Sequence, residues 1–465
     1  MTSSPADQKK PDPSVLRMTA PLVISFVMRA AFTFVDTAYA ATIGDDAVAA
    51  IGLAVPFEFL MIAMWVGMST GLTSCLSRAM GAHQGRRIDQ YLRATLRMVV
   101  FASPLFALLA VGIFFFAERV GLEPEVGRQF KIYGTVLIGG AAFTSFWSVI
   151  PDSVVKAHQD TRSTMWAGIA SNLLNVALNT LFLFVFGWGI FGIALSTVIG
   201  RLAGLAYATA KARGHERRRI AAQEDDAPGL DPSPYWSLLR LALPASIVFG
   251  MTALESLLIN YLLAGMSNPT EAIAAYSIYY RVALFALNPI IALGIALLPY
   301  AALRWGRADL DGMRRGLRDA TAASVVYSLL LVAPVVLLLA DPIARALAES
   351  PVTARYAAFA LKLVPISCLA GIPFLLARPI FEAMQQGRPG LIMGMVRYLV
   401  LTTPLCFLGI WGARQLGQPE LYGLVVALLA VGLLSSGGFG IWLLLALRRA
   451  QPTPAGETGL VKPLA

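Results

Sequence analysis

Long apolar runs constrain the fold of this 465-residue chain more than any other feature. A helix needs roughly 20 residues to cross about 30 Å of hydrocarbon, and twelve runs reach that length. Backbone groups inside lipid must be satisfied within the protein, and the alternating polarity of a membrane β-barrel is missing, so each run is expected to be a helix. We predict an all-α integral membrane protein with these spans: 19–43, 47–76, 95–117, 131–154, 163–186, 190–211, 239–265, 271–300, 319–340, 354–383, 391–412 and 421–447.

The composition agrees with this fold class. Hydrophobic residues make up 57% of the chain and charged residues 14%, against about 45–50% and about 25% in soluble domains. The net charge of +10 comes from residues in connectors between apolar runs, so we expect a lipid bilayer and a small-molecule substrate as partners and no nucleic acid. The cysteines lie singly in apolar runs, which predicts neither a metal site nor a disulfide framework, and we expect no cofactor.

Most of the 37 Lys and Arg residues lie in the two terminal tails and in the connectors that follow even-numbered runs. Cation excess of this kind marks cytoplasmic loops. We therefore predict that both termini are cytoplasmic and that the protein is a multi-pass protein of the inner or plasma membrane. We also expect it to function as a monomer.

The second half of the chain repeats the first. Gly81 of one connector corresponds to Gly306 at an offset of 225, and Gln159 corresponds to Gln385 at an offset of 226. Six spans per repeat give both halves the same orientation, so the two six-helix bundles should be related by a pseudo-two-fold axis along the membrane normal. The predicted parts are a tail (1–18), a first lobe (19–213), a flexible linker (214–238), a second lobe (239–447) and a tail (448–465).

One acidic residue, Asp36, stands in the first apolar run, where the only other formal charge is Arg29. An ionised carboxylate in the middle of a membrane span costs roughly 2.5–3.5 kcal/mol on insertion scales. Two explanations are open. Asp36 exchanges protons inside a water-accessible cavity, or it pairs with Arg29 on the same helix face and only ties helices together. The cost of the charge favours the functional explanation.

The fifth run carries Asn172, Asn175 and Asn179, whose spacing places all three on one helix face. We expect them to form a hydrogen-bonded cluster with Asp36, although Asn172 alone is more typical of a residue that joins helices. The corresponding positions of the second half are Ile259, Tyr398, Leu401 and Leu405. The polar cluster is therefore predicted in the first lobe only.

A second set of charges lies within the apolar runs: Glu58, Glu255, Arg281, Lys362 and Arg378. Glu255 and Arg281 share a depth, at about 1.5 Å per helical residue, so a structural pair and a contact between Glu255 and substrate or cation are both open. The possible substrate or cation contacts are Glu255, Arg281, Arg29, Glu58 and Asn172.

The three histidines lie in connectors and are predicted to be solvated: His83, His158 and His215. No intramembrane histidine or Asp-x-x-Asp pair supports a membrane-embedded transferase, so we do not expect an enzyme.

Several motifs resemble those of multidrug and toxic compound extrusion (MATE) transporters, in particular the DinF-like branch. They extend over nearly the whole membrane region: Pro21, Phe34–Thr37, Gly44, Ala49–Leu53, Gln159–Arg162, Asn175-x-x-x-Asn179 and Gly187–Thr197.

The resemblance implies an efflux antiporter of two lobes, V-shaped around a central cleft with alternating access. It assigns proton coupling to Asp36 with Asn175, Asn179 and Thr197, and a helix bend to Pro21. Relatives in the NorM-like branch carry acidic cation ligands in the second lobe. Here the corresponding part of span 10 is apolar around Pro373 and Glu255 is displaced by about one turn, which favours proton over sodium coupling.

These observations predict a proton-coupled exporter of hydrophobic or cationic small molecules. A sodium-coupled exporter and a lipid-linked glycan flippase of the same superfamily stay as alternatives. The flippase would need several cations gathered to meet a pyrophosphate, and the sequence scatters Arg29, Arg281 and Arg378.

Overall fold

The computed structural model describes residues 14–32, 35–119, 123–222 and 229–450, without the side chains of residues 29–32. All regular structure in these ranges is helical. The first bundle consists of α1 (Val15–Phe32), α2 (Val35–Ala41), α3 (Asp45–Gly81), α4 (Gly85–Phe116), α5 (Pro124–Ala157), α6 (Thr161–Thr180) and α7 (Gly189–Ala221), with short segments η2 (Ala117–Arg119) and η3 (Leu181–Val185).

The second bundle begins after the central connector. It consists of α8 (Pro234–Ala264), α9 (Pro269–Gly306), α10 (Leu310–Tyr327), η4 (Ser328–Val332), α11 (Ala333–Leu347), α12 (Pro351–Lys362), α13 (Val364–Ala383), α14 (Arg388–Met395), η5 (Val396–Leu401), α15 (Thr402–Gln415) and α16 (Glu420–Arg449). The segments η3, η4 and η5 are π-helical turns that continue neighbouring α-helices within single spans.

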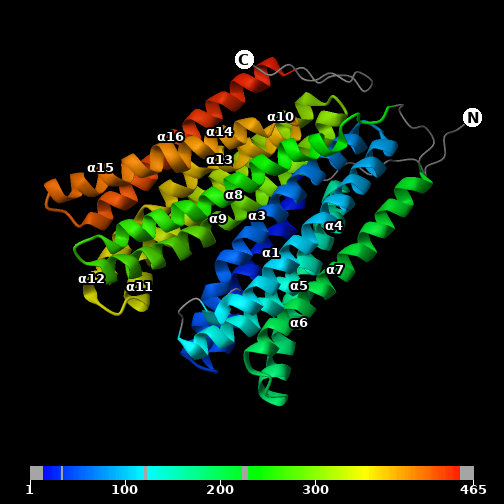
Figure 1. Cartoon of the computed structure of the whole chain (residues 1–465). Coiled ribbons are helices and arrows are strands. Elements are labelled where there is room, and N and C mark those ends of the chain that lie inside the picture. The colour runs from blue at the N-terminus through cyan, green and yellow to red at the C-terminus, as the bar shows by residue number, and fades with distance from the viewer. Residues whose placement is uncertain (1–13, 33–34, 120–122, 223–228, 451–465) are drawn as a thin grey trace, which may run out of the picture.

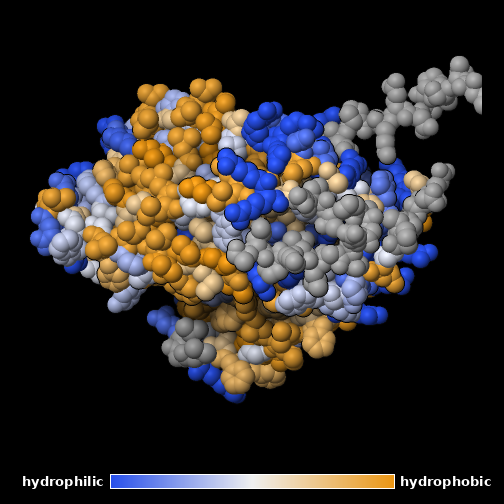
Figure 2. All heavy atoms as spheres, turned by 90° about the horizontal axis from the view of Figure 1, so that it is seen from above, coloured by the Kyte–Doolittle hydropathy of each residue, from blue (hydrophilic) through white to orange (hydrophobic). Residues whose placement is uncertain are grey.

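Within the described ranges, 11 helices are long and apolar enough to cross a membrane. The remaining expected span, 19–43, is present as α1 and α2 on either side of residues 33–34. Large apolar side chains face outward on many helices, and Figure 2 shows a broad apolar area with hydrophilic residues gathered beside it. The prediction of an all-α integral membrane protein is confirmed.

The two bundles meet at one end of the molecule and diverge toward the other, which gives a V shape (Figure 1). We call the end where α1 begins and α16 ends the terminal face. The start of α1 belongs to the seam between the bundles, because Val15, Met18 and Leu22 are buried in the hydrophobic core of the second bundle.

The internal duplication is visible in the backbone. Four non-glycine residues of the described chain have a left-handed conformation, with φ between 53° and 64°: His83, Gln159, Ala308 and Gln385. They form two pairs at the offsets of the sequence repeat, and all four lie in tight turns at the terminal face. Because such φ values are uncommon outside glycine, their recurrence supports the predicted pseudo-two-fold relation of the bundles.

The bundles approach each other closely where α3 crosses α9 at the terminal face. A Cβ atom on Gly81 would overlap the carbonyl oxygen of Leu303, and a Cβ on Gly306 would overlap the carbonyl oxygen of Arg78. These are the same contact seen from the two halves, since both residue pairs are related by the repeat offset of 225. Only glycine permits the two backbones to approach so closely.

Polar contacts surround this crossing. Ser74 of α3 donates to the carbonyl oxygen of Glu382 at 2.6 Å, and the amide of Gln385 donates to the Ser74 hydroxyl at 2.6 Å. Ser74 is fully buried and Gln385 nearly so. In this state the protein is therefore tightly packed between the bundles at the terminal face.

The predicted flexible linker, 214–238, is shorter in the structure than expected. Helix α7 continues to Ala221 and α8 begins at Pro234. The connector is also attached to the first bundle, because Tyr91 of α4 donates to the Asp231 carboxylate at 2.8 Å. The composition of the segment gave no sign that a basic stretch would continue the helix of the preceding span.

The α3–α9 crossing predicts a strong difference between two glycines of the same helix. Gly81→Ala should lower the free energy of unfolding by about 1–3 kcal/mol, because the added methyl group forces the bundles apart. Gly52→Ala is the matched control, since a Cβ there meets no atom within 4 Å, and it should be neutral or stabilising by up to about 1 kcal/mol. Thermal unfolding in detergent measures both, and equal shifts would contradict the assignment.

Candidate functional site

Asp36 lies in the first turn of α2, inside the first bundle. Its side chain is half-buried and accepts two hydrogen bonds. The amide of Asn179 on α6 donates to Oδ1 at 2.7 Å, and the hydroxyl of Thr197 on α7 donates to Oδ2 at 3.0 Å. Residues from three helices that are far apart in the sequence therefore meet at this carboxylate.

A second layer of hydrogen bonds fixes these donors. Asn175 donates to the Thr197 hydroxyl at 3.0 Å, and Asn179 also donates to the side-chain oxygen of Asn175 at 3.3 Å. Ser196, which the sequence reading did not single out, donates to the side-chain oxygen of Asn179. Asn179 and Ser196 are fully buried. The predicted spacing on one face of α6 thus brings Asn175 and Asn179 together, whereas Asn172 is half-buried and makes no hydrogen bond with the described residues.

This geometry can accommodate Asp36 with or without a proton. The Thr197 hydroxyl lies 3.0 Å from Oδ2 of Asp36 and 3.1 Å from the carbonyl oxygen of Ile193. It can donate to an ionised Asp36, or it can turn its proton to Ile193 and accept a hydrogen bond from a protonated, neutral Asp36.

The charge nearest to this cluster in the described chain was missed in the sequence. Arg201 of α7 forms an ion pair with Glu58 of α3 at 2.7 Å and acts electrostatically on Asp36. The sequence does hold a signal for this ion pair, because Arg201 is a cation in the middle of the predicted span 190–211. Glu58 was expected as a possible substrate contact, and here it balances Arg201. The proposed pairing of Asp36 with Arg29 lies outside the described side chains.

The second bundle has a polar centre of its own, which corrects the prediction of a cluster in the first lobe only. Glu255 of α8 accepts a hydrogen bond from Thr402 of α15 at 3.1 Å. The cation that acts on Glu255 is Arg397 of η5, which the sequence reading passed over, and the expected pairing with Arg281 is not the contact found. Arg397 lies one residue from Tyr398, the counterpart of an asparagine of α6, so the charge in this apolar run was the available signal.

Comparison with models of protein families shows which family the chain belongs to. The family model described as MatE matches residues 21–181 and 244–408, one segment in each half, and together they cover more than half of the chain. The chain belongs to the MatE family. The resemblance seen in the motifs is thereby confirmed, while the DinF-like branch stays a prediction.

Individual relatives of this MatE protein are distant. The chain is 27% identical over 326 residues to a probable multidrug resistance protein, YoeA, of Bacillus subtilis. This alignment covers 67% of this chain and 69% of the relative. The chain is 24% identical over 419 residues to a FAD transporter of Shewanella oneidensis, which covers 85% of this chain and 87% of the relative.

Solved structures share the fold. An outward-facing multidrug resistance MATE family transporter of the MOP superfamily has a TM-score of 0.84 at 18% identity, covering 94% of this chain and 96% of that one. The Vibrio cholerae MATE transporter VcmN in the bent form has a TM-score of 0.82 at 23% identity, with 94% and 96% covered. At these identities the likeness shows the fold alone.

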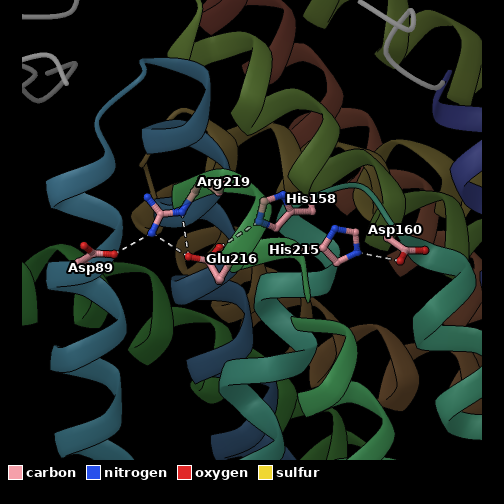
Figure 3. Close-up of polar contacts among 6 residues, drawn as sticks. All are labelled: Asp89, His158, Asp160, His215, Glu216 and Arg219. Carbon is pink, nitrogen blue, oxygen red and sulfur yellow. Dashed lines mark hydrogen bonds and ion pairs between the residues drawn. The ribbon is translucent and has the colours of Figure 1, made fainter. Parts of the chain in front are cut away.

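A cluster of charged residues occupies the terminal face of the first bundle, outside the apolar runs (Figure 3). The rings of His158 and His215 are stacked with centroids 4.9 Å apart and planes 15° apart. Each ring has a carboxylate partner at 2.9 Å, Glu216 for His158 and Asp160 for His215. The expectation that these two histidines are simply solvated was wrong, whereas His83 is exposed as expected.

The cluster joins three elements. Arg219 on the extension of α7 binds Glu216 at 2.7 Å and Asp89 of α4 at 2.7 Å. Burial raises the pKa of Glu216, but hydrogen bonds from His158 and Arg219 outweigh it and hold this pKa below its usual value. The hydrogen bond from His215, together with those from Ser163, lowers the pKa of Asp160 to about 2. The cluster therefore ties the α5–α6 turn to α7 and α7 to α4.

Asp160 also caps α6, since it accepts a hydrogen bond from the Ser163 backbone N–H at 3.1 Å. Asp160→Ala should lower the free energy of unfolding by about 1 kcal/mol, as loss of an N-cap does. A carboxyl group with a depressed pKa contributes stability above its ordinary pKa, and that contribution is lost as the pH falls toward about 2. Thermal unfolding in detergent between pH 7 and pH 3 measures both effects.

Two control variants separate charge from capping. Asp160→Asn keeps a capping side chain, so it should unfold less readily than Asp160→Ala at pH 7 and should lack the acid-dependent part of the loss. Asp311→Asn, at a side chain that is 79% exposed, should behave like the wild type throughout. A wild type and an Asp160→Asn variant with parallel pH profiles would refute the charge contribution.

Proposed function

We propose that this MatE protein exports hydrophobic or cationic small molecules in exchange for protons, with Asp36 as the proton carrier. The observation that supports this most directly is the hydrogen-bond arrangement around Asp36, in which Thr197 can serve either protonation state. An intramembrane carboxylate surrounded by neutral donors is costly, and such residues usually mark ion or proton pathways. The names of the relatives, a multidrug resistance protein and a FAD transporter, agree with a small-molecule substrate.

The path from protonation to movement runs through α1. Its first half packs against the second bundle, with Val15, Met18 and Leu22 in that core, while α2 carries Asp36 into the first bundle. Pro21 lies between these regions, inside α1. Proline removes one backbone hydrogen bond and favours a bend at its position. A change in the contacts of Asp36 can therefore alter the angle of α1 at the seam and bias the bundles toward opening.

The orientation follows from the charges. Lys and Arg residues concentrate in the connectors at the terminal face, so we place this face in the cytoplasm of a cell whose inner or plasma membrane holds the protein as a monomer. The described state is then closed toward the cytoplasm by the α3–α9 crossing. Alternating access would require this seam to part while the opposite ends of the bundles approach.

Asp36→Asn tests the proton carrier. In proteoliposomes with an imposed pH gradient, export of a cationic dye should fall by at least about tenfold, because an amide cannot exchange a proton. The exposed control Asp311→Asn should export like the wild type. A parallel experiment with an imposed sodium gradient distinguishes the alternative coupling ion. Unchanged proton-driven export by a folded Asp36→Asn protein would refute the proposal, and export driven by sodium alone would replace it with sodium coupling.

Thr197 offers a finer test, because serine keeps the hydroxyl and valine only the shape. Thr197→Val should slow proton-driven export by roughly tenfold and displace its pH profile, as expected when one hydrogen bond to a charged group, about 1.5–3 kcal/mol, is lost. Thr197→Ser should keep the profile within about twofold in rate. Export rates of both variants are measured over a pH series. Equal effects of the two variants would show that the Thr197 hydroxyl does not take part in proton coupling.

A further inference from the structure

Arg397 of η5 is a cation in the second bundle that has no counter-ion at contact distance among the described residues. No described carboxylate forms an ion pair with its guanidinium, and no described residue accepts a hydrogen bond from it. Its Nε atom is buried and without a partner. Arg201 of the first bundle, by contrast, forms an ion pair with Glu58 at 2.7 Å. An intramembrane cation is expected to be paired, so the free donors of Arg397 need an explanation.

Aromatic rings hold the guanidinium in place. It lies over the ring of Phe374 at 4.9 Å and near the ring of Tyr398 at 5.5 Å, as centroid distances. Cation–π contacts of this kind stabilise the charge without using its N–H donors. When aromatic rings pack against the faces of a guanidinium group, the N–H donors along its edge can still bind a carboxylate or phosphate.

Tyrosines of α9 supply flat surfaces in the same region. The rings of Tyr276 and Tyr280 are stacked, with centroids 6.2 Å apart and planes 23° apart, and Tyr280 is 50% exposed. Glu255 acts electrostatically on both tyrosines and on Arg397, which places these groups around one centre. The π-helical turn that carries Arg397 is a further mark, because such turns in α-helices are frequent at functional sites.

We propose that Arg397, with Tyr276 and Tyr280, forms a second binding site in the second bundle, which takes the carboxylate or phosphate group of a ring-bearing small molecule. The inference rests on the proposed export function and extends its substrates to organic anions. Arg397 binds the anionic group, and the exposed tyrosine stacks on the ring. Glu255 opposes the anion when it is ionised, so it limits the affinity of the site for anions and favours cations.

Two dyes with the same xanthene rings and opposite charges test this site. Fluorescein is anionic and rhodamine 6G is cationic, and fluorescence polarisation with the full chain in detergent measures the binding of each. Arg397→Gln should weaken fluorescein binding by at least about tenfold, which is the usual effect of losing a charged hydrogen bond, and change rhodamine 6G binding by less than about twofold. Arg318→Gln is the control, because that side chain is 77% exposed.

Two further variants keep the proposal falsifiable if Arg397→Gln does not fold. Arg397→Lys keeps the charge and should weaken fluorescein binding by no more than about threefold. Glu255→Gln should strengthen fluorescein binding and weaken rhodamine 6G binding. The proposal is overturned if the wild type does not bind fluorescein, if Arg397→Gln binds it like the wild type, or if Arg397→Gln loses both dyes equally. Binding needs no gradient, so Asp36→Asn should still bind fluorescein even if the proton mechanism fails.

Discussion

The backbone contact between α3 and α9 joins the two bundles at the terminal face. Gly81 and Gly306 allow each helix to place a carbonyl oxygen where the other would carry a side chain. Because the two halves contribute the same contact, the interface is self-complementary, as in a two-fold symmetric dimer. Such a contact can act as a pivot, since it is repeated about one axis and lies at the end where the two bundles meet (Figure 1).

A pivot transmits a signal only if some element belongs to both sides, and α1 meets this condition. Its start contributes Val15 and Met18 to the core of the second bundle, and the helix that follows it, α2, places Asp36 among donors of the first bundle. The donors themselves are held from α6 and α7, and Asn179 is fully buried, so it cannot follow a large movement of Asp36. In the proposed mechanism, a change in the bonding of Asp36 would be taken up along α1, where Pro21 lies.

Much of this architecture could be predicted from the sequence because membrane spans are long, local signals. The twelve apolar runs, the repeat offset and the face shared by Asn175 and Asn179 each depend on residues near one another in the chain. The structure agrees with the repeat offset, with the shared face and with most of the runs, but the run expected at 354–383 is divided at Leu363 into α12 and α13. The candidate cluster was found because an intramembrane carboxylate is conspicuous in an apolar run.

The features that escaped prediction depend on contacts between distant segments. His158 and His215 lie far apart in the sequence, and only the fold stacks them beside Glu216. The helical extension of α7, read as flexible linker, is held by Arg219 and its partner Asp89 on α4. No local pattern reports such pairing, because a charged connector has the same composition whether its charges are solvated or paired.

The two bundles share a fold and differ in the chemistry of their centres. The first surrounds a carboxylate with neutral donors and balances its guanidinium, Arg201, with Glu58. The second leaves Arg397 without an ion pair among the described residues and sets it against rings. Since Glu58 already balances Arg201, ionised Asp36 is held by neutral donors, and a single proton can remove its charge. Arg397 and Glu255 act on each other without forming an ion pair, so the donors of Arg397 stay available to a charged group from outside. Duplication followed by such a division would let one bundle bind the driving ion while the other binds cargo, with the α3–α9 seam between them.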